Sequence, residues 1–373
     1  MLVAANVFTT QVARLVARWK LEGGLPKVPG QKVDTPLTTG AQGALPEIPL
    51  TWPKENFRIV PDGELGPACT GDADYAGTFV VYDWDTRQII WQSSWGAMVV
   101  TPAGFCFADG VMYLNDVEGA NIFVVDVDRE PGRLIRRISH PYLNDLHSLE
   151  RTSRGLLTTS SGVDSILELD LQGNLLYEWW AYEHGYDTSP SGKKRTAGRG
   201  QEHRDQYYHT RYHTTHLNDA RFRDPDERFV LSLLFHQGEL IEIDRSLPPE
   251  KQKAKVLLSG LVRPHGLEPT PLGWLLCNSL SKELLILDDD FKIADRIAYD
   301  GGWIQDCTML DNGRILLNDV DNHRLVEHAG PPWEISNVTQ YPDSWRMGEL
   351  LQVPAGYEAG FRRVAKPQAR SQA

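Results

Sequence analysis

The chain has 373 residues and a formal net charge of −12, with a pI near 5.4. This balance excludes a nucleic-acid-binding role, because no excess of lysine and arginine exists to neutralise phosphates. The four cysteines form no CxxC pair, so the sequence indicates neither a disulfide framework nor a cysteine-based zinc site. No apolar run reaches the roughly 18 residues that a helix needs to span a membrane.

Residues 1–54 are expected to form an amphipathic helix followed by a linker rich in proline and glycine. Apolar side chains recur at the i, i+3, i+4, i+7 spacing of one helix face: Val12, Leu15, Val16 and Trp19. The helix is interpreted as docked on its own domain, and contact with a partner or a membrane surface remains the alternative. The segment lacks the charged start and compact apolar stretch of a secretory signal, so we expect a cytoplasmic protein.

One β-segment recurs six times between residues 55 and 345. Each copy is a short run rich in Val, Ile and Leu that ends in an acidic residue before a turn: Asp83, Asp126, Asp170, Asp244, Asp288 and Glu327. Successive copies are about 44 residues apart once an insertion of about 30 residues is subtracted, and such a period of short strands is typical of propeller blades. The sequence predicts an all-β, six-bladed β-propeller over residues 55–345, its first blade built from the N-terminal segment. Residues 346–373 are expected to form a C-terminal extension with a disordered end.

A second repeated stretch, which forms the start of the inner strand of each blade, precedes each acidic residue at a nearly fixed distance. It gives His147, His216 and His265 the same phase in three successive blades, at the start of the strand that lines the channel. Gln305 has this phase in the sixth blade. A single buried histidine is more often a hydrogen-bonded core residue, but three in register favour a functional site where the imidazoles meet at one end of the channel.

Residues 181–212 form a polar, Gly-rich insertion ahead of the fourth inner strand. Inserted there, the segment is expected to cover or border the channel mouth onto which the histidines open, although a plain surface excursion is the alternative. Tyr208 and Arg211 near its end, and His213 just after it, are predicted to contact the substrate.

Residues 216–244, HLNDARFRDPDERFVLSLLFHQGELIEID, resemble a segment of the bacterial arylsulfotransferases that carries H-x-N, D-P-x-D and H-Q-G. The segments LHSLERTSRGLLTTS and PHGLEPTPLGWLLCNS are similar to the other histidine-bearing inner strands of that family. The resemblance covers residues 98 to 330. It implies a six-bladed propeller in which three histidines and an arginine surround the channel, and one histidine carries a sulfuryl group during ping-pong transfer between phenol esters.

By this resemblance His265 matches the nucleophile, His147 and His216 match the other two catalytic histidines, and Asn218 is a substrate contact. The chain departs from the family directly before H-Q-G, where Phe235 takes the position of the arginine. Phe235 and Gln305 are therefore expected to contact the substrate. An arginine binds a transferring oxyanion through charge-assisted hydrogen bonds. Arg263 is the first candidate to supply this charge, with Arg211 and Arg314 as further ones.

Two other functions stay open. The three histidines, His147, His216 and His265, could ligate one iron or zinc ion in an oxygenase, lyase or hydrolase. Each histidine precedes a carboxylate by three residues (Glu150, Asp219 and Glu268), which would either accept its second N–H or brace a neighbouring blade. A non-catalytic binding propeller is the second alternative. The leading interpretation is an arylsulfotransferase-like enzyme that acts on an aromatic small molecule without a cofactor.

Overall fold

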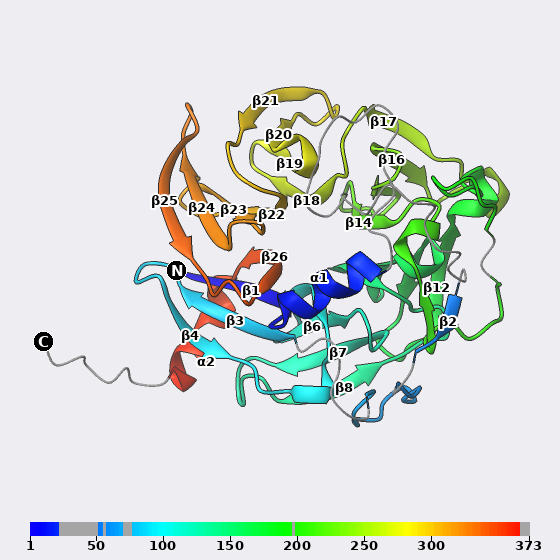
Figure 1. The fold of residues 1–373 in the computed structure, drawn as a ribbon, viewed down its shortest axis with the longest axis horizontal. Helices are drawn as coiled ribbons and strands as arrows, with labels where there is room; N and C mark the ends of the chain where they lie inside the picture. The colour runs from blue at the N-terminus through cyan, green and yellow to red at the C-terminus, as the bar shows by residue number, and fades with distance from the viewer. Residues whose placement is uncertain (22–50, 55–56, 70–76, 196–197, 366–373) are drawn as a thin grey trace, which may run out of the picture.

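The computed structural model describes residues 1–21, 51–54, 57–69, 77–195 and 198–365. These residues form six four-stranded antiparallel sheets around a central axis, together with one two-stranded ribbon (Figure 1). The predicted six-bladed β-propeller is therefore confirmed. Each blade runs outward from an inner strand at the axis.

The strands of the blades follow one order, from the axis to the rim. Blade 2 contains β5 (Pro102–Ala108), β6 (Val111–Asp116), β7 (Asn121–Asp126) and β8 (Leu134–Ile138). Blade 3 contains β9 (Leu146–Arg151), β10 (Leu156–Ser160), β11 (Ser165–Leu169) and β12 (Leu175–Trp180). Blade 4 contains β14 (Leu217–Phe222), β15 (Phe229–Leu234), β16 (Glu239–Asp244) and β17 (Lys255–Ser259). Blade 5 contains β18 (His265–Thr270), β19 (Gly273–Asn278), β20 (Glu283–Leu287) and β21 (Ile293–Ala298), and blade 6 contains β22 (Ile304–Met309), β23 (Ile315–Asp319), β24 (Arg324–Ala329) and β25 (Glu334–Gln340).

The recurring apolar segments are the third strands of the blades, and their side chains form the buried layers between neighbouring sheets. Several of the acidic residues that end these segments cap the next turn. Asp170 Oδ1 accepts hydrogen bonds of 2.8 Å from the backbone N–H groups of Gln172 and Asn174. Asp126 Oδ1 accepts two in the same way, at 2.9 Å. The repeat thus follows from turn chemistry as well as from apolar burial.

Blade 1 is built from both ends of the chain. Its order is β26 (Arg346–Gln352), β1 (Leu2–Thr9), β3 (Thr78–Asp83) and β4 (Gln88–Gln92). The C-terminal strand β26 pairs antiparallel with the N-terminal strand β1 and closes the ring. The predicted propeller boundaries, residues 55–345, are therefore too narrow at both ends, because β1 and β26 lie outside them and complete blade 1. Closing the ring in this way leaves no exposed sheet edge between the first and last blades.

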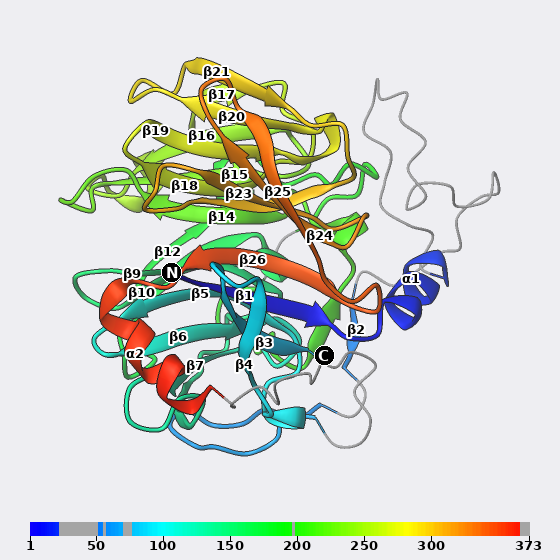
Figure 2. The ribbon, with the colours of Figure 1, turned by 90° about the vertical axis from the view of Figure 1, so that its left-hand side faces the viewer.

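The other predicted terminal features are partly present. Helix α1 (Val12–Leu21) forms as expected, and residues 22–50 of the predicted linker lie outside the described part. Helix α1 and the ribbon of β2 (Thr51–Pro53) and β13 (Gln206–Tyr208) lie on one face of the propeller, whereas α2 (Ala355–Val364) lies on the opposite side (Figure 2). The predicted disordered end falls on residues 366–373, which are also outside the described part.

Candidate active site

One end of the channel contains a cavity of about 190 Å³, on the face that carries α1 and the β2–β13 ribbon. The three predicted histidines, His147, His216 and His265, all line it. They reach it from the start of β9, from the residue before β14 and from the start of β18. Their shared phase in the repeat therefore brings them to one cavity, as the sequence predicts.

The rings form a chain of edge-to-face contacts along the cavity wall. The ring centroids of His147 and His216 are 4.9 Å apart. The ring of Phe235 lies next to both His216 and His265, with centroid distances of 5.1 Å and 5.3 Å. Trp303 follows, 5.1 Å from His265. Aromatic side chains make up much of the wall: Phe8, Tyr207, Tyr208, Phe235 and Trp303.

Hydrogen bonding fixes the tautomer of His265. Its Nδ1 lies 3.0 Å from the carbonyl oxygen of Arg263 and 3.0 Å from the hydroxyl of Ser279. A carbonyl oxygen only accepts, so Nδ1 carries the proton and Nε2 keeps its lone pair. Burial first, and then the nearby His147 and Arg346, lower the pKa of His265 to about 3, although the hydrogen bond to the Arg263 carbonyl opposes this shift. The ring is therefore neutral at physiological pH, with one basic nitrogen available.

A second chain of hydrogen bonds joins two histidines of the 213–216 loop. His213 Nε2 lies 3.1 Å from the carbonyl oxygen of Tyr208 and must donate to it. Nδ1 of His213 is then an acceptor, and Nδ1 of His216, 2.8 Å away, donates to it. Burial, together with the neighbouring histidines, holds the pKa of His216 well below its usual range.

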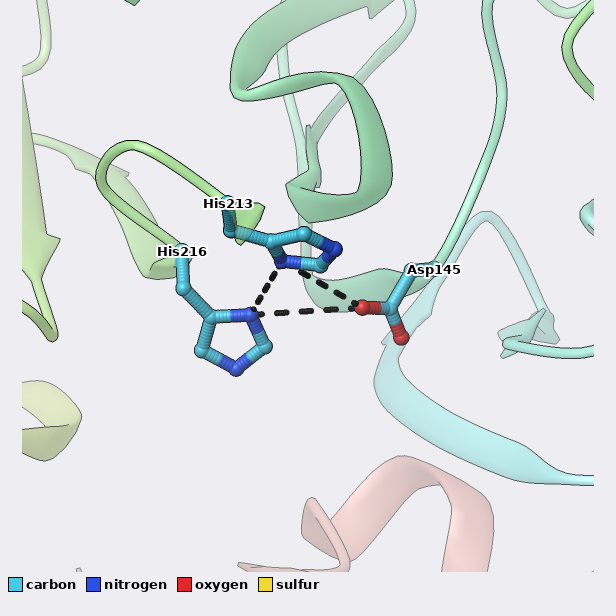
Figure 3. A group of neighbouring side chains, drawn as sticks. All are labelled: Asp145, His213 and His216. Carbon is cyan, nitrogen blue, oxygen red and sulfur yellow. Dashed lines mark hydrogen bonds and ion pairs between the residues drawn. The ribbon is translucent and has the colours of Figure 1, made fainter. Parts of the chain in front are cut away.

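Asp145 lies beside this pair (Figure 3). Its Oδ2 is 3.9 Å from Nδ1 of His213 and 3.9 Å from Nδ1 of His216. Its Oδ1 is 3.5 Å from Nε2 of His147. Burial raises the pKa of Asp145, but His147 and His213 outweigh this effect and the net shift is downward. The carboxylate is therefore ionised beside three imidazoles.

The predicted three-histidine metal set does not form. Among the described His, Cys, Asp and Glu side chains, the group whose ligand atoms come within 4.8 Å of one another is Asp145, His213 and His216. Phe235 lies between His216 and His265 and separates them. Of the predicted ligands, only His216 belongs to this group.

The backbone is strained where the site is built. Asp145, His216 and Arg263 have φ values of 50°, 49° and 53°, in the left-handed region that side chains other than glycine rarely adopt. Asp145 and Arg263 both stand two residues before a cavity histidine. Eight other described non-glycine residues, among them Asp109 and Lys282, also have positive φ, so these three values show how the cavity loops are built and do not single out the site.

Three of the predicted substrate contacts line the cavity: Tyr208, Phe235 and Gln305. His213, Arg211 and Asn218 do not. His213 is fully buried in its hydrogen bonds to Tyr208 and His216. The Arg211 guanidinium packs 5.9 Å from the Tyr212 ring centroid. Asn218 Nδ2 donates to the carbonyl oxygen of Pro264 at 2.9 Å and so ties two blades together.

Arg263 is buried but does not line the cavity. Its guanidinium carbon lies 5.0 Å from the Phe235 ring centroid, so the aromatic ring comes between this charge and the substrate space. Burial lowers the pKa of Arg263 to about 10. The expectation that Arg263 supplies the catalytic charge is therefore not met by its position. Arg314, the further candidate, forms an ion pair with Glu327 at 2.7 Å instead.

Arg346 is the cavity arginine that the sequence reading missed. It begins β26, the inner strand of blade 1, and lines the cavity with His265 and Gln305. The repeat contained a signal for it, because Arg346 stands 41 residues after Gln305, as Gln305 stands 40 residues after His265. Continuing the period by one step gives Arg346 the phase of the histidines. Asp145 was also missed, and no repeat signal marks it.

The carboxylates that follow the histidines brace the blades. Glu150 Oε2 accepts from the backbone N–H of Phe222, and Asp219 Oδ2 accepts from that of Leu267, both at 2.8 Å. Glu268 Oε1 accepts from the hydroxyl of Thr308 at 3.0 Å. Each bond reaches the next blade, so the bracing alternative is the one the structure shows.

The end of the insertion borders the cavity. Tyr207, Tyr208 and Thr210 contribute to its lining, as predicted for this segment. The insertion is anchored by Arg195, whose Nη1 lies 3.2 Å from Oδ2 of Asp164 and whose guanidinium carbon lies 4.7 Å from the Tyr208 ring centroid. Arg195 and Tyr208, from the two halves of the insertion, thus pack together next to Asp164.

Comparison with known proteins supports the fold and gives no information on function. No family model matches the chain, and no curated protein matches it. A solved structure of a protein of unknown function from Bacteroides caccae is 14% identical, with a TM-score of 0.52 over 74% of this chain and 95% of that one. A Bacteroides uniformis protein, provisionally described as a 6-phosphogluconolactonase, is 16% identical, with a TM-score of 0.51 over 75% of this chain and 83% of that one. A streptogramin B lyase is 12% identical, with a TM-score of 0.45 over 66% of this chain and 86% of that one.

Within the described residues, no helix is long and apolar enough to cross a membrane. At identities this low, the solved structures support the propeller fold and say nothing of its chemistry.

Proposed function

We propose that the protein is an enzyme that transfers a sulfuryl or related group to or from an aromatic small molecule, with His265 as the nucleophile. The observation that carries this proposal is the fixed tautomer of His265. Its Nδ1–H is held by the Arg263 carbonyl and its basic Nε2 belongs to a ring that lines the cavity. A neutral imidazole nitrogen of this kind is a competent nucleophile at neutral pH.

The cavity supports an aromatic substrate. Its volume of about 190 Å³ suits one substituted aromatic ring, since a cavity of roughly 150 Å³ is enough to hold benzene. The walls offer Phe235 and Trp303 beside His265 for edge-to-face contacts. Gln305, which accepts a hydrogen bond from Trp303 Nε1 at 3.0 Å, adds a polar group to the same wall.

The first chemical step follows from these positions. Nε2 of His265 attacks the sulfur of an aryl sulfate; the N–S bond forms while the bond from sulfur to the aryl oxygen breaks, and the phenolate leaves. The ring then carries a positive charge, which the Arg263 carbonyl stabilises by accepting Nδ1–H. Arg346 lines the same cavity and is the candidate to stabilise the anionic oxygens of the group in transfer.

The second step reverses the first with another phenol. The oxygen of the acceptor attacks sulfur, the N–S bond breaks, and the imidazole of His265 is restored. His216, whose Nδ1 donates to His213, keeps the lone pair on Nε2 and can take the proton of the acceptor phenol. The resemblance to bacterial arylsulfotransferases agrees with this double displacement.

Steady-state kinetics test the proposal. With an aryl sulfate donor and a phenol acceptor, varying both should give the parallel double-reciprocal lines of a ping-pong reaction. His265→Asn should abolish transfer in a protein that keeps the melting temperature of the parent within a few degrees. Intersecting lines, or full activity in the His265→Asn protein, would reject His265 as the nucleophile.

A further inference from the structure

The group of Asp145, His213 and His216 stands apart from His265. It lies on the blade 3 and blade 4 side of the cavity, and Phe235 separates it from the proposed nucleophile. Its ligand atoms face one another in Figure 3, with both Nδ1 atoms directed toward the carboxylate. The proposed group transfer does not explain why a carboxylate should stand 3.9 Å from both rings.

The spacing of the three ligand atoms fits a metal ion. Nδ1 of His213 and Nδ1 of His216 are 2.8 Å apart, and each is 3.9 Å from Oδ2 of Asp145. A triangle with these three sides has a circumscribed circle of radius about 2.1 Å. One point in the plane of the three atoms therefore lies at about 2.1 Å from all of them, within the roughly 2.0–2.2 Å that zinc keeps from imidazole nitrogen and carboxylate oxygen. In a tetrahedral site the ligand atoms are about 3.4 Å apart, so the two Nδ1 atoms would separate slightly when an ion binds.

The surrounding hydrogen bonds prepare this arrangement. The Tyr208 carbonyl accepts from Nε2 of His213, so Nδ1 of that ring is already free of a proton. A histidine that binds a metal commonly donates its second N–H to such a carbonyl. His216 differs, because its Nδ1 proton must move to Nε2 before Nδ1 can coordinate an ion.

Further contacts hold the loop that carries both histidines. Asp164 Oδ1 accepts from the backbone N–H groups of Thr215 and His216, at 3.0 and 2.8 Å, and Oδ2 accepts from that of Thr214 at 2.8 Å. Asp164 thus holds the backbone of three consecutive residues, Thr214 to His216, directly after His213. Ligands held in this way lose little conformational freedom when an ion binds.

We infer that Asp145, His213 and His216 form a binding site for one divalent ion of the zinc class, with a fourth position open to the cavity or to His147. Nε2 of His147, which has no hydrogen-bond partner among the described residues, lies 3.5 Å from Oδ1 of Asp145. Two imidazoles and one carboxylate suit zinc and similar transition ions, whereas calcium and magnesium prefer oxygen ligands. The inference does not depend on the proposed transfer and competes with one step of it, because a bound ion would leave the proton on Nε2 of His216, the atom proposed to accept the proton of the phenol.

Metal titration of the full chain tests the site. Protein freed of metal with a chelator is titrated with Zn²⁺ in a calorimeter and with Co²⁺ in a spectrophotometer. We expect one ion per chain, visible Co²⁺ absorption bands of low-symmetry coordination that Zn²⁺ removes, and no competition from Ca²⁺. Asp145→Asn and His213→Gln should each weaken Zn²⁺ binding by more than about 100-fold, because each removes one of three protein ligands.

His265→Gln is the matched control, since it changes a histidine of the same cavity that lies outside the ligand group. It should keep the parent affinity for Zn²⁺ while it abolishes the proposed transfer, so the two proposals can fail separately. Loss of Zn²⁺ binding in the His265→Gln protein would restore the three-histidine site and overturn this one. Absence of stoichiometric Zn²⁺ binding by the parent, with its circular dichroism spectrum unchanged by the chelator, would also overturn it.

Discussion

Nη1 of Arg195 lies 3.2 Å from Oδ2 of Asp164, and both side chains are buried. Arg195 belongs to the insertion, whereas Asp164 follows the short helical turn after β10 and binds the loop that leads to His216. The pair therefore joins the segment that borders the cavity to the loop that carries the candidate ligands. This contact makes the insertion part of the site.

Replacing Arg195 should destabilise the protein. Arg195→Met leaves the Asp164 carboxylate buried without its counter-ion, and breaking a buried pair costs about 3 kcal/mol in the free energy of unfolding. Urea denaturation measures the change. Arg199→Met is the control, because Arg199 is 40% exposed in its ion pairs with Glu178 and Glu183 and should change the stability by less than about 1 kcal/mol. An equal loss in the free energy of unfolding in the two variants would show that the pair of Arg195 and Asp164 does not stabilise the protein in this way.

The two arginines near Phe235 should differ in their effect on catalysis. Arg346 lines the cavity, whereas Arg263 packs on Phe235 and does not. We expect Arg346→Met to lower kcat by about 100-fold or more, the usual effect of removing a group that stabilises transition-state charge. Arg263→Met should change kcat less than Arg346→Met does, and its main effect should be a lower free energy of unfolding. A larger loss of kcat in the Arg263→Met protein would show that Arg263, and not Arg346, stabilises the charge of the transition state.

Phe235 should determine affinity for aromatic ligands. Phe235→Leu removes the ring between His216 and His265. An aromatic pair contributes about 0.5–1.5 kcal/mol, so the Kd of a phenol should rise by about 2- to 12-fold. Calorimetry measures this change. Phe291→Leu is the matched control, because Phe291 is equally buried but packs beside Trp274 in blade 5, away from the cavity. An unchanged Kd in the Phe235→Leu protein would exclude a direct contact.

The bracing carboxylates predict how stability depends on pH. Burial raises the pKa of Glu268 to about 8 and the nearby Asp306 adds to the shift, while Thr308 and Arg221 oppose it. A glutamic acid whose pKa is higher in the folded state contributes stability below its unfolded pKa of about 4.3, and this stability is lost as pH rises through about 8.

Between pH 6 and pH 9 the free energy of unfolding of the parent should therefore fall. In the Glu268→Gln protein it should fall by at least about 1 kcal/mol less over the same range. The amide keeps an oxygen to accept from Thr308 but cannot ionise. Urea denaturation at a series of pH values provides the comparison. Parallel pH profiles for the two proteins would show that Glu268 does not titrate in this range.

Much of this structure was predictable because the repeat has a local physical cause. The acid at the end of most third strands caps a turn, as Asp170 does, and this chemistry recurs in neighbouring blades. The phase of His147, His216 and His265 follows from the same period. The pairing of β1 with β26 was not predictable from the period, since the two strands come from opposite ends of the chain, although the period itself continues to Arg346 at the start of β26.

The metal-ligand group shows the same limit. Asp145 stands on a turn with a left-handed backbone, outside the phase shared by the histidines, and its approach to His213 depends on packing between two blades. The exclusion of Arg263 from the cavity likewise depends on the orientation of Phe235, which no sequence pattern records.

Covalent trapping tests the central claim most directly. The parent protein is mixed with an aryl sulfate in the absence of an acceptor, quenched in alkali, where a sulfurylated imidazole persists longer than in acid, and digested for mass spectrometry. The proposed mechanism predicts the added mass of one sulfuryl group on the peptide that contains His265, its absence in the His265→Asn protein, and its loss when a phenol is added before quenching. An aryl sulfate that is turned over without any adduct on His265, or an adduct on His147 or His216 instead, would contradict the claim.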